Sequence, residues 1–212
     1  MKKYDVIILS GGKGTRVKKY TKEIPKCLIK IKGKPFLYYQ LRYLKKYKIR
    51  NVIISTCYLS YKIKEYVKKN INFLNIKIID DVKPLGTGGA INKSLKYLKK
   101  NFFVIYGDSY LNFNLNRMAN KTNFAIMAIY KNDNKFDRSN VKINNTNIIY
   151  DKSNKIKNDL NYIDYGISYV NKEVFKNIQK KKFDFSIVME NLSKEKKLKG
   201  YIVKKRFYEI GS

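Results

Sequence analysis

The stretch DVIILSGGKGTR at residues 5–16 decides the fold. Its first part, 5–9, is a short apolar run of the kind that forms a buried parallel strand. The glycines that follow end the strand in a loop whose backbone N–H groups can turn inward around an anion. A plain tight turn is the alternative interpretation. The glycine spacing excludes both the Walker A loop and the dinucleotide-binding fingerprint.

Strands and helices alternate through the first half of the sequence. From Pro35, the apolar residues Leu37, Leu41 and Leu44 follow helical spacing, and proline suits a first helical turn. The cycle is expected to continue with strands at 52–54, 76–79 and 102–106, and with helices at 60–69, opened by Ser60, and at about 88–99. This alternation predicts a mainly parallel sheet with helices on both faces.

The second half of the sequence has a different pattern, with strands separated by polar clusters. We expect strands at 124–130, 141–143, 148–150, 162–170 and 200–204, and helices near 171–179 and at 184–193. They are interpreted as a mixed or antiparallel extension of the same sheet, because no linker or repeat intervenes. The predicted fold class is therefore α/β, a three-layer Rossmann-like sheet in one domain, 1–212, with halves at 1–115 and 116–212.

Composition excludes several kinds of chemistry. The chain has no histidine, so Ser-His-Asp and Cys-His nucleophile pairs and HExxH zinc helices are excluded. Cys27 and Cys57 cannot form a zinc tetrad and are expected to be reduced thiols. No signal-length apolar region begins the sequence and no apolar stretch reaches about 18 residues. A cytoplasmic protein without membrane contact is therefore predicted.

Lysine dominates a formal net charge of +31, which comes from 47 basic and 16 acidic residues. This charge favours anionic partners, phosphates and nucleic acids alike. A nucleic-acid-binding protein remains an alternative, but it would prefer arginine-rich segments interleaved with aromatic residues. Lysine here is spread over the whole length, so no specific nucleic acid is predicted as a partner.

Loops that could carry chemistry are expected where parallel strands end, because ligands bind there in open α/β sheets. The loop at 10–16, with Arg16 as a charged fork, fits a triphosphate. Lys26 follows Pro25 and could lie near the same phosphates. Asp108 ends a strand and is the kind of carboxylate that binds a divalent metal together with a nucleotide. A turn aspartate that caps local N–H groups is the alternative.

Four motifs together resemble the sugar-1-phosphate nucleotidyltransferases, enzymes that make nucleotide sugars. The motifs are LSGGKGTR (9–16), IPKCL (24–28), PLGTGGAI (84–91) and YGDS (106–109). Within that family, PLGTGGAI and the short length most resemble single-domain heptose 1-phosphate guanylyltransferases, with mannose 1-phosphate guanylyltransferases and short uridylyltransferases close behind. Relatives continue into a closing helix beyond Ser212, and Glu209 stands where they usually have aspartate.

The resemblance implies a nucleotide-diphospho-sugar transferase fold. It also implies transfer of a nucleotidyl group, with GTP favoured, to a sugar 1-phosphate for surface-glycan biosynthesis. Arg16 and Lys26 are implied as catalytic residues, and Asp108 and Glu209 as ligands of Mg²⁺. Implied nucleotide-binding residues are Leu9, Ser10, Gly11, Gly12, Lys13, Gly14, Thr15, Thr87, Gly88 and Gly89. Implied sugar-phosphate-binding residues are Lys152, Asp164 and Gly166.

Three alternatives to this function stay open. One is a uridylyl- or cytidylyltransferase of the same family, acting on another phosphorylated small molecule. Another is a regulatory relative without activity, and the third is the nucleic-acid-binding protein. The oligomeric state is not fixed by the sequence, and a homo-oligomer is compatible with it.

Overall fold

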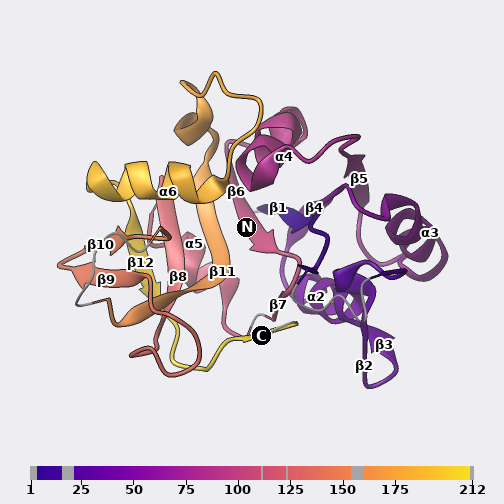
Figure 1. Ribbon diagram of the computed structural model, residues 1–212, viewed down its shortest axis with the longest axis horizontal. Helices are drawn as coiled ribbons and strands as arrows, with labels where there is room; N and C mark the ends of the chain where they lie inside the picture. Colours follow the sequence, from indigo (N-terminus) through magenta and orange to yellow (C-terminus); the bar gives the residue numbers. More distant parts are fainter. Residues whose placement is uncertain (1–3, 16–21, 111, 123, 154–159, 211–212) are drawn as a thin grey trace.

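A sheet of nine strands forms the centre of the protein in a computed structural model, which describes residues 4–15, 22–110, 112–122, 124–153 and 160–210. In order across the sheet, the strands are β5 (Ile76–Asp80), β4 (Ile49–Thr56), β1 (Tyr4–Ser10), β6 (Asn101–Tyr106), β11 (Tyr162–Asn171), β8 (Ala125–Lys131), β12 (Lys199–Ile202), β10 (Asn147–Tyr150) and β9 (Val141–Asn144). Figure 1 shows them from β5 at the right to β9 and β10 at the left. One sheet thus spans both halves of the sequence.

The first half of the sequence supplies the parallel part of the sheet. Strands β5, β4, β1 and β6 pair in parallel, so their carboxyl ends meet at one edge. Strand β11 runs antiparallel to both β6 and β8, and β12 is parallel to β8. Strand β10 pairs antiparallel with β12 and β9. A parallel first half with a mixed extension is what the sequence predicted.

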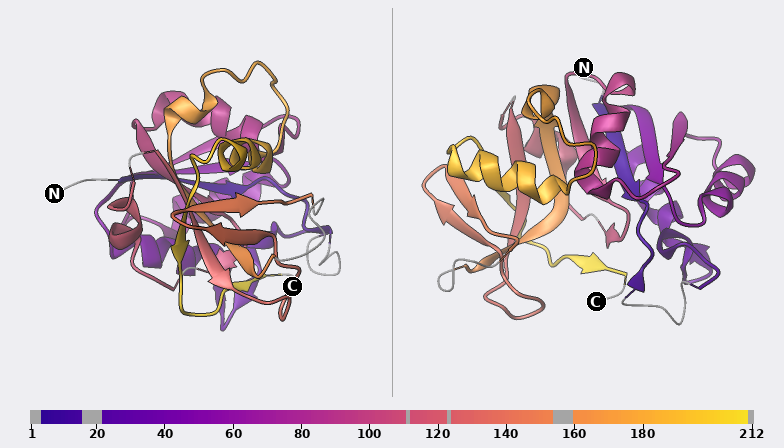
Figure 2. Two further views of the ribbon diagram at one scale, coloured as in Figure 1. Left: turned by 90° about the vertical axis from the view of Figure 1, so that its left-hand side faces the viewer. Right: turned by 45° about the horizontal axis from the view of Figure 1, so that its top comes forward.

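Helices cover both faces of the sheet, as expected. One face carries α2 (Phe36–Lys45), α3 (Ser60–Asn70) and α5 (Leu115–Ala119), and the other carries α4 (Gly86–Ser94) and α6 (Phe185–Lys194). In the left view of Figure 2, α4 and α6 lie above the sheet and α2 lies below it. None of the helices in the described part of the chain has the length and apolar composition needed to cross a bilayer.

The two cores follow from the two-residue period of the strands. In β1, Val6 and Ile8 pack into the core beneath α2 and α3, whereas Ile7 packs into the core beneath α4 and α6. All three side chains are fully buried. Each such burial stabilises the fold by about 1.5–3 kcal/mol, so this short apolar run contributes to both cores.

Short elements connect the larger ones. The two-residue strands β2 (Lys30–Ile31) and β3 (Lys34–Pro35) form a hairpin, and β7 (Ser109–Tyr110) pairs antiparallel with β13 (Tyr208–Glu209). The 3-10 helices that lie wholly within the described residues are η2 (Lys26–Leu28), η3 (Leu95–Tyr97) and η4 (Lys172–Phe175). The pairing of β7 with β13 brings residues near the end of the chain to the end of β6, and Figure 1 shows the C label beside β7.

Several boundaries differ from the prediction. The helix expected near 171–179 is only the 3-10 helix η4, because the chain leaves it to lay residues 181–184 against the start of α4. Helix α3 begins at Ser60, but this hydroxyl does not cap the helix and lies 2.7 Å from that of Thr56. Helix α4 begins at Gly86 and ends at Ser94, earlier at both ends than expected. The last predicted strand, 200–204, is β12.

Candidate active site

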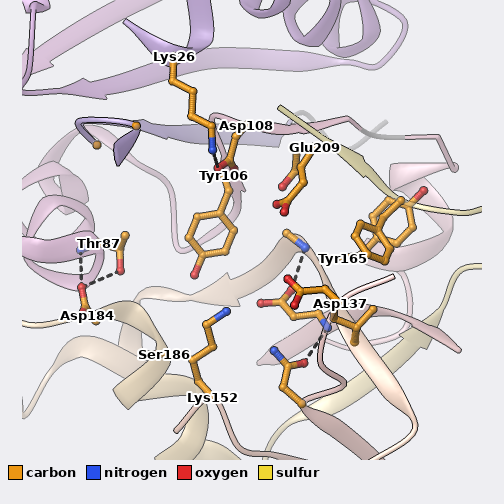
Figure 3. Close-up of a pocket in the computed structure, with 18 of the residues that line it drawn as sticks. Lys26, Thr87, Tyr106, Asp108, Asp137, Lys152, Tyr165, Asp184, Ser186 and Glu209 are labelled. Atoms are coloured by element: carbon orange, nitrogen blue, oxygen red, sulfur yellow. Dashed lines mark hydrogen bonds and ion pairs between the residues drawn. The ribbon is translucent and has the colours of Figure 1, made fainter. Parts of the chain in front are cut away.

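A cleft of about 690 Å³ lies at the carboxyl ends of β1 and β6 (Figure 3). Its lining residues are Gly12, Lys13, Gly14, Thr15, Lys26, Thr87, Tyr106, Asp108, Ser109, Asp137, Arg138, Asn140, Lys152, Ile163, Asp164, Tyr165, Gly166, Asp184, Ser186, Phe207 and Glu209. Most of the site residues expected from the sequence are in this set. The cleft therefore joins the glycine loop of the first half to residues of the second half.

The glycine loop forms one wall of the cleft. Gly14 has a φ of 62°, a left-handed conformation that glycine adopts at little cost. A Cβ built on Gly12 would have no heavy atom within 4 Å, so this glycine faces open space. A ligand can therefore approach the backbone of the loop closely. Arg16, expected to complete the loop, lies outside the described residues.

Residues 9–11 support the loop from behind and do not line the cleft. The C=O of Leu9 accepts a hydrogen bond from the N–H of Gly107 at 3.0 Å. A Cβ on Gly11 would lie 3.4 Å from the Cβ of Cys57, so that glycine packs against the end of β4. The Ser10 hydroxyl is buried near Gly107. Leu9, Ser10 and Gly11 thus fix the position of the loop, and their predicted contact with a nucleotide stays a prediction.

Lys26 and Asp108 form an ion pair within the cleft. Lys26 Nζ lies 2.8 Å from Asp108 Oδ2, and the two side chains are 19% and 31% exposed. The 3-10 turn that holds Lys26 is closed by a hydrogen bond from the Leu28 N–H to the Pro25 C=O at 2.8 Å. A partly exposed pair of this kind contributes on the order of 1 kcal/mol, so a charged ligand can displace either partner at small cost.

Glu209 reaches the same region by the pairing of two short strands. It lies opposite Ser109 in the β7–β13 pair, and the Ile210 N–H donates a hydrogen bond to the C=O of Asp108 at 3.0 Å. Figure 3 shows the side chains of Asp108 and Glu209 on the same side of the cleft. Two carboxylates, distant in sequence, therefore face one space beside Lys26.

Thr87 and Asp184 join the first turns of α4 and α6. Asp184 Oδ1 accepts a hydrogen bond from the N–H of Thr87 at 3.3 Å, while Thr87 Oγ1 accepts one from the N–H of Phe185 at 2.8 Å. Each residue thus satisfies an N–H group that the other helix leaves without an internal partner. Both line the cleft, so the two helix starts are held together at its edge.

Gly88 and Gly89 do not line the cleft. Their N–H groups donate hydrogen bonds to the C=O of Phe183 at 2.9 and 3.1 Å. A Cβ on Gly88 would meet the Phe183 ring at 2.2 Å, and one on Gly89 would meet the Lys181 C=O oxygen at 2.4 Å. Glycine is needed at these two positions, as expected, but in the structure the backbone of Gly88 and Gly89 lies close to residues 181–184. The contact with a base stays a prediction.

Lys152, Asp164 and Gly166 line the opposite end of the cleft. Burial raises the pKa of the Asp164 carboxyl to about 6, against the opposing effects of a 2.8 Å hydrogen bond from the Gly166 N–H and of the nearby Lys152 ammonium. Gly166 has a φ of 82°, and a Cβ there would lie 2.1 Å from the Ser109 hydroxyl. The residues expected to bind the sugar phosphate are thus brought together.

Several lining residues were missed by the sequence analysis. They are Tyr106, Ser109, Asp137, Arg138, Asn140, Ile163, Tyr165, Asp184, Ser186 and Phe207. Tyr106 could have been found, because it precedes Gly107 and Asp108 at the end of a predicted strand. Asp137 and Arg138 lie in a polar loop whose sequence predicts only a turn. For Asp184 the sequence predicts only the start of a helix, since nothing local in the sequence pairs it with Thr87.

Similarity to known sequences extends over nearly the whole chain. The chain is 34% identical over 207 residues to the D-glycero-α-D-manno-heptose 1-phosphate guanylyltransferase of Campylobacter jejuni, with 97% of this chain and 93% of that protein covered. It is 31% identical over 214 residues to the protein of the same name from Aneurinibacillus thermoaerophilus, with 98% and 93% covered.

Solved structures and a family pattern agree with these relatives. The structure of HddC from Yersinia pseudotuberculosis complexed with GMP-PN has a TM-score of 0.80 and 27% identity, with 99% of this chain and 94% of that chain covered. The inositol-1-phosphate CTP transferase of T. maritima, with a TM-score of 0.84 and 20% identity, shares the fold. The pattern described as nucleotidyl transferase matches residues 5–209. The chain therefore belongs to the nucleotidyl transferase family.

Proposed function

We propose that this protein transfers a guanylyl group from GTP to a sugar 1-phosphate and releases pyrophosphate. The observation that carries the proposal is the cleft, which has the glycine loop and the Lys26–Asp108 pair at one end and Lys152 with Asp164 at the other. The names of the two heptose 1-phosphate guanylyltransferases support guanine and a seven-carbon sugar. A uridylyl or cytidylyl group is the alternative.

The reaction asks for positioning and charge neutralisation. A phosphate oxygen of the sugar 1-phosphate attacks the α-phosphorus in line, and a new P–O bond forms. The bond from the α-phosphorus to the bridging oxygen of the β-phosphate breaks, and its electron pair leaves with pyrophosphate. Little covalent chemistry is needed from the protein, which suits a chain without histidine.

The glycine loop and two cations would hold the triphosphate. Backbone N–H groups from 11–15 and the Arg16 side chain would bind the β- and γ-phosphates, whose charge grows as pyrophosphate leaves. Lys26 would exchange Asp108 for the α-phosphate when the nucleotide arrives, which the modest strength of the ion pair permits.

Asp108 and Glu209 would hold Mg²⁺ together with the nucleotide. The residues that the structure describes contain no cluster of three or more potential metal ligands, so this carboxylate pair is too small a set to bind the ion tightly by itself. Mg²⁺ usually takes one or two protein carboxylates plus substrate phosphates and water, so the donor set fits. When bound, the ion would neutralise phosphate charge.

The acceptor would lie against Lys152, Asp164 and Gly166. Lys152 would neutralise its phosphate, and Asp164 would accept hydrogen bonds from its hydroxyls. The product is a nucleotide sugar, which a glycosyl transfer reaction would consume in building a surface glycan. A cytoplasmic location is part of this proposal, and the two free thiols, Cys27 and Cys57, are compatible with it.

The test is a coupled assay of pyrophosphate release. Purified protein is mixed with Mg²⁺, each of the four nucleoside triphosphates, and either D-glycero-α-D-manno-heptose 1-phosphate or mannose 1-phosphate. We expect release with GTP and the heptose. Release with UTP or CTP in its place would move the assignment to the alternative. No release with any pair, from protein that gives a cooperative melting transition, would refute the proposal.

A further inference from the structure

Helix α2 buries one polar side chain among apolar ones. Its buried residues are Phe36, Leu37, Gln40, Leu41 and Leu44, and Gln40 is 2% exposed. A polar side chain is tolerated in such a place when its hydrogen bonds are made within the protein. Gln40 does not line the cleft, so the partners of its amide are other parts of the chain.

The Gln40 amide spans the turn that follows β6. Its Nε2 donates hydrogen bonds to the C=O of Tyr106 at 3.0 Å and to the C=O of Ser109 at 2.9 Å, and Figure 1 shows α2 beside β7. Carbonyl oxygens only accept, so the group that faces them is the NH₂ end of the amide, with both hydrogens used. Asp108 lies between the two bonded residues. The backbone on either side of this carboxylate is therefore tied to one planar group from α2.

The same amide restrains the strand pair that carries Glu209. Ser109 lies opposite Glu209 in the pairing of β7 with β13. The N–H of Ile210 donates a hydrogen bond to the C=O of Asp108 at 3.0 Å, which ties the end of β13 to the same turn. A shift of Ser109 would thus move the two proposed metal ligands, Asp108 and Glu209, relative to each other.

The oxygen of the Gln40 amide is in a different situation from its nitrogen. Oε1 is buried and has no hydrogen-bond partner among the residues that the structure describes. A buried acceptor without a partner costs stability. The side chain is therefore placed for its two N–H donors, and the turn at 106–109 is what these donors hold.

The ion pair of Lys26 with Asp108 cannot hold the carboxylate throughout the proposed reaction. Lys26 would leave Asp108 for the α-phosphate when the nucleotide arrives. From that point Asp108 needs a restraint that does not depend on Lys26. The two hydrogen bonds from Gln40 reach the backbone from α2, outside the cleft, and involve no group that the nucleotide would displace.

We infer that Gln40 is a positioning residue for the Mg²⁺ site. It acts through the backbone of the turn at 106–109, which fixes where the Asp108 carboxylate meets the ion and how far it stands from Glu209. This inference rests on the proposed function. Mg²⁺ demands near-ideal octahedral geometry, so a displaced carboxylate binds it poorly. Loss of a group that orients a metal ligand typically costs about 10–100-fold in metal affinity or activity.

The experiment compares Gln40→Met with the parent and with Leu41→Met. Methionine removes both N–H donors at nearly constant volume, and Leu41→Met places a methionine in the same buried face of α2 without loss of a hydrogen bond. Calorimetric titration measures the Kd of GTP with Mg²⁺ and with EDTA. The pyrophosphate assay measures the Mg²⁺ concentration that gives half-maximal turnover.

For Gln40→Met we expect this Mg²⁺ concentration to rise about 10–100-fold. The gain in GTP affinity that Mg²⁺ provides should fall, while the Kd of GTP in EDTA stays that of the parent. Leu41→Met should match the parent in all three measurements. A role of Gln40 in stability alone would change Tm and leave the Mg²⁺ dependence as it is.

An unchanged Mg²⁺ dependence in Gln40→Met, or an equal rise in the Kd of GTP with Mg²⁺ and with EDTA, would overturn the inference. A parent that binds GTP no more tightly with Mg²⁺ than with EDTA would also overturn it. If the parent shows that gain but releases no pyrophosphate, the proposed function fails, and calorimetry still decides the role of Gln40.

A second measurement applies if Gln40→Met gives no cooperative melting transition. In a crystal structure of the parent with GTP and Mg²⁺, both hydrogen bonds from Gln40 to the turn should remain while Asp108 binds the ion. An Asp108 carboxylate bound to the ion with either hydrogen bond broken would contradict the inference.

Discussion

Gly89→Ala should destabilise the protein and leave catalysis by the folded molecules intact. The new Cβ would stand 2.4 Å from the Lys181 C=O oxygen and 3.0 Å from the Cβ of Leu85. Because the closer of these two atoms belongs to the backbone, the segment 181–184 must move away from α4. Overpacking of this kind costs about 1–3 kcal/mol. A 2.4 Å approach to backbone belongs to the upper part of this range, about 2–3 kcal/mol. Alanine recovers up to about 1 kcal/mol in a helix, which leaves a net loss of about 1–2 kcal/mol.

A loss of this size lowers Tm by about 2–8 °C in a protein of this length. Differential scanning calorimetry measures Tm, and GTP titrations in the pyrophosphate assay measure KM below the transition. Gly12→Ala is the matched control: its Cβ has no neighbour within 4 Å, so Tm should hold while the KM for GTP rises. An unchanged Tm with a raised KM for GTP in Gly89→Ala would refute the reasoning and favour contact of that glycine with the base.

Three further predictions concern charged groups. Asp108→Asn should abolish Mg²⁺-dependent turnover, whereas Glu209→Gln should reduce it and raise the Mg²⁺ concentration needed. A Mg²⁺ titration of the turnover of both variants checks this. An unchanged midpoint of the titration in Glu209→Gln would remove that residue from the metal site. Arg16→Ala should lower kcat by about 10²–10³ with little change in Tm, and near-parental turnover contradicts its role at the leaving pyrophosphate. Burial raises the pKa of Asp164 from 3.8 to about 6, so between these pH values the folded state binds a proton that the unfolded state does not. Stability should therefore fall as pH rises through this window, and Asp164→Asn should flatten the dependence in urea unfolding; a parallel pH profile in both proteins contradicts the shift.

The strands and helices of the first half and their parallel arrangement could be predicted from local sequence, because strands such as 5–9 are bounded by glycine and followed by amphipathic helices. Local sequence could not predict the contacts between segments that are distant in the chain. Asp184 lies 97 positions from Thr87, and nothing in either segment shows that they bond to each other. The helix expected near 171–179 failed for the same reason, since packing against α4 overrides local propensity.

The predicted site residues also divide into those that the structure brings together as expected and those whose neighbours the sequence could not predict. Lys26 is predicted to lie near the phosphates and Asp108 to bind a metal together with the nucleotide, and the structure places Lys26 Nζ 2.8 Å from Asp108 Oδ2. Gly88 and Gly89 were expected to face a base, and the structure places them against residues 181–184. A glycine motif reports that something approaches the backbone closely, but the sequence does not say whether that is a ligand or another part of the chain.

The position of β8 in the sheet has a consequence for biosynthesis. Its two neighbours, β11 and β12, both follow it in the chain, so β8 leaves the ribosome with neither edge paired. Its residues 125–129 are almost completely buried in the finished fold. Until residues 162–171 have been made, an apolar strand with two open edges is exposed to other nascent chains, which makes the chain prone to aggregation during this interval. Slower translation or lower growth temperature after this point gives β11 time to pair and favours recovery of the native protein.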